Sequence, residues 1–234
     1  MLTLLLVGLL LGMKHALDAD HVAAVAALAT RSTSFKDTVR QGIVWGAGHT
    51  LTLLAFGGAV LAMDANIPEG TADALEFAVG AMLMLLGLDV LRRAHRQKTH
   101  LHAHRHTGGI VHFHAHSHAD DQAPHDSEHH QHPHVKAFPL RALAVGMMHG
   151  MAGSAALLLL TARAAESVSL GLLQIAVFGV GSMLGMGALS AAIALPLQRS
   201  ARWTAGAHLA LQWLVGVSTA VLGGVVMVQI AAGS

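Results

Sequence analysis

Histidine and aspartate residues gather within seven positions of a largely apolar stretch near the start of the chain. His15, Asp18 and His21 recur every three residues, and Asp20 lies beside them. At 100° per residue this spacing places the first three on one helical face about 120° wide. Two imidazoles and a carboxylate on one face favour a divalent first-row metal, and the absence of thiolates argues against Cu(I). Asp20 points to another side of that helix, where a role in supporting the ligands is natural.

Two isolated histidines in later apolar stretches could add donors to this group. His49 follows Trp45-Gly-Ala-Gly, and His149 opens the segment that begins His-Gly-Met-Ala-Gly. A lone histidine of this kind often serves only as a hydrogen-bonding group between helices, and we assign His208 to that class. The predicted metal-binding residues are therefore His15, Asp18, Asp20, His21, His49 and His149.

The elements that must position these residues are long apolar stretches. Six of them reach the roughly 20 residues that a helix needs to cross a bilayer: 2–29, 40–63, 72–91, 140–161, 168–195 and 206–231. Apolar residues make up 53% of the chain and charged residues only 12%, against about a quarter in soluble domains. The sequence predicts an all-α integral membrane protein with six transmembrane helices in contact with the lipid bilayer.

Charged groups in the first stretch are costly in that setting. An ionised side chain near the bilayer centre costs about 2.5–3.5 kcal/mol, so Lys14, Asp18 and Asp20 must be paired, hydrated or ligating. A metal site satisfies this requirement. An ion-paired, hydrated patch of Lys14 with either aspartate, which would only fix packing, is the alternative.

The distribution of basic residues predicts the orientation. Twelve of the fourteen lysines and arginines lie in three loops, those after the first, third and fifth stretches. Basic loops stay in the cytoplasm, so we expect both termini outside. The net charge of +1 gives no basis for a nucleic-acid partner, and the absence of cysteine excludes a disulfide scaffold.

The two halves of the chain resemble each other. Gly12-Met-Lys-His15 recurs as Gly146-Met-Met-His149, and residues 41–51 match 174–184 at nearly the same offset. Gly80 and Gly87 likewise match Gly216 and Gly223. Three helices per half is an odd number, so the second half must enter the membrane from the opposite side. We therefore expect two inverted three-helix repeats, 1–94 and 138–234, the architecture of secondary transporters.

A histidine-rich segment at 95–137 separates the two repeats. It contains fourteen of the nineteen histidines, many at alternating positions, together with glycine, proline and scattered charge. Alternation could also suit a strand, but this composition favours a disordered cytoplasmic loop. Such a loop could store metal, sense it or pass it to a cytoplasmic acceptor, or it could be a solvated linker that binds metal incidentally.

The run from His15 to His21 has the pattern HxxxxDH and resembles the signature of the nickel/cobalt transporter family. The segment around Trp45 and His49 resembles that family's second motif, and residues 149–160 are most similar to its urease-accessory membrane members. The resemblance implies that His15, Asp20 and His21 recognise the metal, and that the chain lies in the cell membrane of a bacterium. The chain departs from the better-studied members in having six predicted helices rather than eight, and in lacking their acidic motif in the second half.

These observations predict a permease rather than an enzyme. Its expected substrate is Ni²⁺, with Co²⁺ or Zn²⁺ as alternatives, and uptake is the expected direction. An efflux protein of the same fold would use the same residues. A metal-binding scaffold or chaperone, or a histidine-ligated membrane metalloenzyme, is the alternative of another class.

Overall fold

The computed structural model describes residues 2–32, 34–63, 68–96, 99–105, 111–117, 139–151, 167–203 and 205–233. The helices are α1 (Leu2–His15), α2 (Ala19–Ala29), α3 (Phe35–Thr52), the π-helix η1 (Leu53–Gly57), α4 (Gly58–Ala62), α5 (Glu69–Arg96), α6 (Leu140–His149), α8 (Val168–Trp203) and α9 (Ala205–Ala231). Two strands, β1 (Thr99–Arg105) and β2 (Val111–Ser117), lie between α5 and α6.

Four helical segments are long and apolar enough to cross a membrane: Phe35–Ala62, Gly70–Arg96, Val168–Arg199 and Gly206–Ala231. The first of them joins α3, η1 and α4 without a break. Two shorter apolar helices, Leu5–His15 and Ala19–Ala29, precede them. The described helices thus have the composition of a multi-pass membrane protein, and the count of six spans stays a prediction. The fourth predicted span starts as α6, and its remainder lies outside the described residues beyond Met151.

The first predicted span is not one continuous helix. It breaks after His15 and resumes at Ala19, and Asp18 between them has extended backbone angles of φ −62° and ψ 147°. The expectation that His15, Asp18 and His21 share one face of a single helix is therefore wrong. The side chain of Asp18 makes no capping hydrogen bond to α2 and contacts His15 instead.

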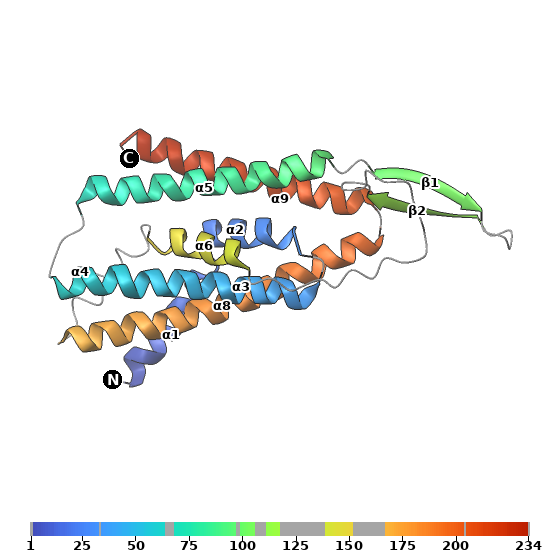
Figure 1. The fold of residues 1–234 in the computed structure, drawn as a ribbon. Coiled ribbons are helices and arrows are strands. Elements are labelled where there is room, and N and C mark those ends of the chain that lie inside the picture. Colours follow the sequence, from blue (N-terminus) through green and yellow to red (C-terminus); the bar gives the residue numbers. More distant parts are fainter. Residues whose placement is uncertain are drawn as a thin grey trace.

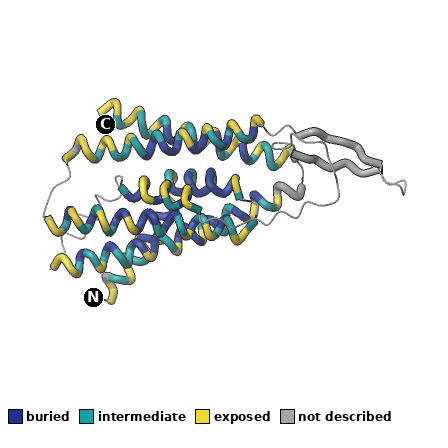
Figure 2. The backbone as a smooth tube through the Cα atoms, viewed as in Figure 1, coloured by how far each residue is buried: buried dark blue, intermediate teal, exposed yellow. Residues whose placement is uncertain are grey.

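Short helices lie at the centre of the bundle, between pairs of long ones (Figure 1). The long helix α3 packs along α8, and α5 packs along α9. Between these pairs lie α2 and α6, which contact α9 and α3 respectively. Buried residues concentrate on α2 and on the inward faces of its neighbours, whereas outward faces are exposed (Figure 2). These outward faces carry large apolar side chains such as Leu85, Leu214 and Val228, as a surface in lipid requires.

Glycines at the helix crossings make contacts that repeat between the two halves. A Cβ atom on Gly12 would collide with the carbonyl oxygen of Phe178, and one on Gly146 would collide with that of Trp45. Gly48 approaches the carbonyl oxygen of Leu143 in the same way as Gly181 approaches that of Leu9. Each contact is related to its counterpart by an offset of 133 or 134 residues. Close backbone approach at small residues is typical of helix packing in membranes.

An arginine cluster joins the ends of α2, α5 and α6. Asp89 accepts hydrogen bonds from Arg31 at 2.7 and 2.8 Å and from Arg141 at 3.2 Å, and Arg93 lies 3.4 Å away. Arg93 also donates to the hydroxyl of Thr30 at 3.0 Å. One carboxylate therefore ties both halves of the chain together at the end where the basic loops begin.

The loop expected to be disordered contains two described strands. β1 and β2 pair antiparallel, and His100, His102 and His104 lie opposite His116, His114 and His112 in the register. These histidines, whose alternation could also suit a strand, thus lie in strands. The rest of the segment 95–137, apart from His95 and Arg96 at the end of α5, lies outside the described residues.

Candidate metal site

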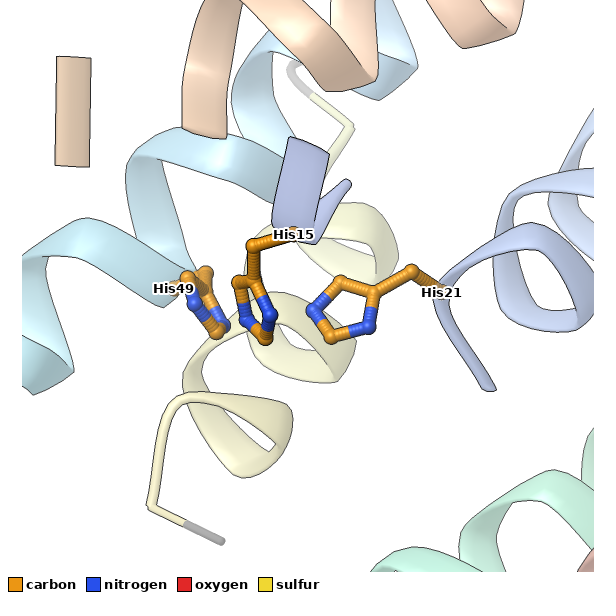
Figure 3. Close-up of side chains that lie close together, drawn as sticks. All are labelled: His15, His21 and His49. Atoms are coloured by element: carbon orange, nitrogen blue, oxygen red, sulfur yellow. The ribbon is translucent and has the colours of Figure 1, made fainter. Parts of the chain in front are cut away.

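Three imidazoles from three helices converge inside the bundle. His15 ends α1, His21 lies in the first turn of α2, and His49 lies in α3 (Figure 3). The ring centroids of His15 and His21 are 4.3 Å apart, and each lies 5.4 Å from that of His49. One nitrogen from each ring lies within 4.8 Å of the other two. The break between α1 and α2 makes this possible, because it lets two nearby residues approach a third from different directions.

All three side chains are removed from solvent. His21 and His49 are 0% exposed and His15 is 9% exposed. Two ring nitrogens, Nε2 of His15 and Nε2 of His21, have no hydrogen-bond partner among the described residues, and neither does either nitrogen of His49. A buried polar atom without a partner is costly, so such atoms call for an explanation. A bound cation provides one, because the lone pairs of neutral imidazole nitrogens are metal donors.

Carboxylates hold the opposite nitrogens of two of these rings. Asp18 Oδ2 lies 2.8 Å from Nδ1 of His15, and Asp20 Oδ1 lies 2.8 Å from Nδ1 of His21. A carboxylate that accepts the Nδ1 proton fixes the tautomer in which Nε2 is unprotonated, and it orients the ring. Both unpartnered Nε2 atoms are therefore in the form that binds a metal.

A fourth histidine adjoins the cluster through Asp20. His149, at the end of α6, places Nε2 2.8 Å from Asp20 Oδ2, and its ring lies 4.3 Å from that of His21. Asp20, His21 and His149 form a second group whose ligand atoms are close enough to hold an ion. The two groups share His21, so the structure offers one continuous set of donors.

The structure brings five of the six predicted metal-binding residues into this set: His15, Asp20, His21, His49 and His149. Asp18 lies at its edge, 54% exposed, and contacts it only through His15. Nitrogen and oxygen donors without sulfur suit Ni²⁺, Co²⁺ or Zn²⁺. His208 lies outside the set and contacts Gln212 at 3.0 Å.

Two aromatic side chains that the sequence analysis did not select also contact the cluster. The indole of Trp45 lies 5.2 Å from the ring of His21 and 5.5 Å from that of His149. Phe178 of α8 lies 5.3 Å from His15. Trp45 and Phe178 align with each other in the internal repeat, and this match is the sequence signal that could have identified them.

Comparison with known proteins identifies a relative over most of the chain. The urease accessory protein UreH of Bacillus sp. (strain TB-90) is 36% identical over 205 residues, which cover 86% of this chain and 81% of the relative. The chain belongs to the UreH family of urease accessory proteins. No family model matches it, and no solved structure is a significant match. This membership agrees with the urease-accessory resemblance of residues 149–160.

Proposed function

We propose that this UreH-family chain is a membrane transporter that carries a divalent transition metal, Ni²⁺ before Co²⁺, across the bilayer. The observation that carries the proposal is the triad His15, His21 and His49, whose unpartnered nitrogens point to one cation site inside an apolar bundle. Two members of the triad lie where α1 ends and α2 begins. Half-helices that end at a central site are typical of transporters.

The family supports nickel as the cargo. Urease is a nickel enzyme, so a membrane protein named as its accessory is well suited to supplying that metal. The donor set agrees, because imidazole nitrogen with carboxylate oxygen suits Ni²⁺ and Co²⁺ better than Mg²⁺ or Ca²⁺. Uptake is the direction that such a supply requires.

Two inverted three-helix repeats would supply the movement. The reciprocal glycine contacts, Gly12 with Phe178 and Gly146 with Trp45, are those expected of two halves related by a two-fold axis. The partners α3 and α8 run in opposite directions, as do α5 and α9 (Figure 1). Rocking one repeat against the other would expose the histidine triad to each side in turn.

The histidine-rich segment at 95–137 would then receive the ion on the cytoplasmic side. Its many imidazoles bind divalent metals weakly and exchange them readily, which suits transfer to a cytoplasmic acceptor. Both termini lie outside in this orientation, because twelve of the fourteen basic residues fall on the side of that segment.

Radiolabelled nickel flux into vesicles that contain the purified protein tests the proposal. Alanine at His15, His21 or His49 should reduce flux to the level of empty vesicles, because each change removes one donor from the triad. His208→Ala is the matched control and should keep normal flux, since His208 lies outside the set and contacts Gln212. Normal flux in the triad variants would overturn the assignment.

Nickel in intact cells reports the direction. Expression of the wild-type protein should raise the amount of cell-associated nickel, and His49→Ala should abolish that rise. A fall on expression of the wild-type protein would identify an efflux protein with the same site. Deletion of residues 99–134 should leave flux through the bundle in place, and loss of all metal handling would favour a scaffold instead.

A further inference from the structure

Aromatic rings contact the histidine cluster at two places that the internal repeat makes equivalent. Phe178 lies 5.3 Å from His15, and Trp45 lies 5.5 Å from His149. Both pairs are related by the offsets of the repeat, since His15 matches His149 and Trp45 matches Phe178. The backbone carbonyls of the two aromatic residues contact Gly146 and Gly12, which are also equivalent. Each ring thus sits where a long helix crosses a short helix of the other repeat.

The two rings lie one turn before equivalent positions on two helices that run in opposite directions. Trp45 precedes His49 by one turn on α3. This helix starts shortly after the basic residue Arg31 in the chain. Phe178 precedes Ser182, the equivalent of His49, by one turn on α8, which starts at the opposite end (Figure 1). One turn is about 5.4 Å, so Trp45 is displaced from His49, and Phe178 from Ser182, toward different ends of the bundle.

A small cavity continues beyond Trp45 toward the ends of α2 and α3 that face the basic loop. Mostly apolar groups line it, Trp45 among them, and Thr38, Gln41 and Ser190 also contribute to the lining. The hydroxyl of Ser190 is buried without a partner among the described residues. Trp45, 0% exposed, thus lies between this cavity, which it lines, and the imidazoles of His21 and His49.

We propose that Trp45 and Phe178 are the two gates of the metal site, Trp45 toward the basic loops and Phe178 toward the opposite face. The inference rests on the proposed transport function and adds the residues that control access. A large apolar ring blocks a hydrated cation, because water is excluded from such a constriction. Displacement of one ring opens the site to one side while the other ring keeps it closed, as alternating access requires.

The chain has no cysteine, so a single introduced thiol reports access to the site without interference. His49→Cys places the reporter in the cluster. In membrane vesicles of known orientation, its reaction with a membrane-impermeant thiol reagent is measured from each side, in the full chain. Labelling needs no metal movement and is therefore independent of the nickel assay.

Adding Trp45→Leu to the reporter should speed labelling from the side of the basic loops by on the order of tenfold, because the rate follows the fraction of open molecules. Adding Phe178→Ala should speed labelling by a similar factor from the opposite side only. Trp45→Phe and Phe178→Trp keep an aromatic ring and should remain protected. Trp213→Leu is the matched control, since Trp213 is 40% exposed on α9, and it should leave labelling unchanged from both sides.

The gate assignment is overturned if neither gate variant labels faster than the Trp213→Leu control, or if both label faster from the same side. Loss of protection in Trp45→Phe as well as in Trp45→Leu would also overturn it, since packing alone would then explain the effect. Sided labelling with no nickel flux in the wild type would support the gate assignment and contradict nickel as the cargo. Nickel flux without sided labelling would contradict the gate assignment and leave nickel as the cargo.

Discussion

At the scale of single residues, the site divides its work between imidazoles and carboxylates. His15 and His21 each use Nδ1 to contact an aspartate and keep Nε2 unpartnered among the described residues. Asp20 is the most connected of these groups, because its two oxygens contact His21 and His149 at 2.8 Å. We therefore expect Asp20 to orient two rings, the supporting role that the sequence analysis considered for it.

Replacing the aspartates should weaken metal recognition in a defined order. Asp20→Asn should raise the nickel concentration for half-maximal flux by about 10–100-fold, the usual effect of losing a carboxylate that orients a ligating histidine. Asp18→Asn should have a smaller effect, because Asp18 contacts one histidine and is 54% exposed. Nickel flux into vesicles over a range of concentrations measures both.

Asp73→Asn is the control for this pair, since Asp73 lies exposed on α5 outside the cluster. An equal and complete loss of flux in Asp18→Asn and His15→Ala would show Asp18 to be a ligand itself. A normal concentration dependence in Asp20→Asn would contradict the orienting role.

The members of the site could be predicted from sequence because charge inside an apolar stretch is costly wherever it occurs. Their roles could not, since they depend on the break between His15 and Ala19. A continuous helix would turn Asp18 toward the ligand face, whereas the extended backbone at Asp18 directs its carboxylate to His15. The approach of His149 to Asp20 depends on packing between segments 129 residues apart, which spacing along the chain does not reveal.

At the scale of elements, the short helices α1 and α6 position their histidines only because their neighbours pack closely. His15 and His149 each follow, by three residues, a glycine that touches the carbonyl oxygen of an aromatic residue. A side chain at Gly12 or Gly146 would push α1 or α6 away from its partner helix. The position of each histidine and the tightness of each crossing are thus coupled.

Alanine at either glycine should destabilise the fold as well as reduce flux. Gly12→Ala and Gly146→Ala should each lower the free energy of unfolding by about 1–3 kcal/mol, the usual cost of overpacking. Thermal unfolding in detergent measures the change. Gly70→Ala is the control, because a Cβ atom there meets nothing within 4 Å, and it should be neutral or slightly stabilising. Stability equal to that of the control in both variants would contradict the tight crossings.

At the scale of the whole molecule, composition and stretch length predicted the helical membrane character, and four helices have the length and apolar surface for it. Residues that match in the internal repeat make similar contacts in the structure, as Gly48 and Gly181 do. The repeat did not predict which helices are short, because stretch length counts apolar residues without regard to breaks such as that at 16–18. The alternation of histidines is compatible with the strands β1 and β2, but the composition of the segment favours a disordered loop, so the strands were not predicted.

The proposed inverted arrangement makes a further prediction about the faces of the membrane. The start of α3 and the end of α5 should face one side, and the end of α4 and the start of α8 the other, as their places at opposite ends of the bundle require (Figure 1). Single cysteines at the exposed positions Lys36 and His95 should react with an impermeant reagent only from the cytoplasm, and those at Met63 and Ser167 only from outside. All four positions are accessible in the fold, so reactivity reports the side of the membrane. Reaction of Met63→Cys and Lys36→Cys from the same side would show that the segment formed by α3 and α4 does not cross the bilayer. The two repeats could then not be inverted relative to each other.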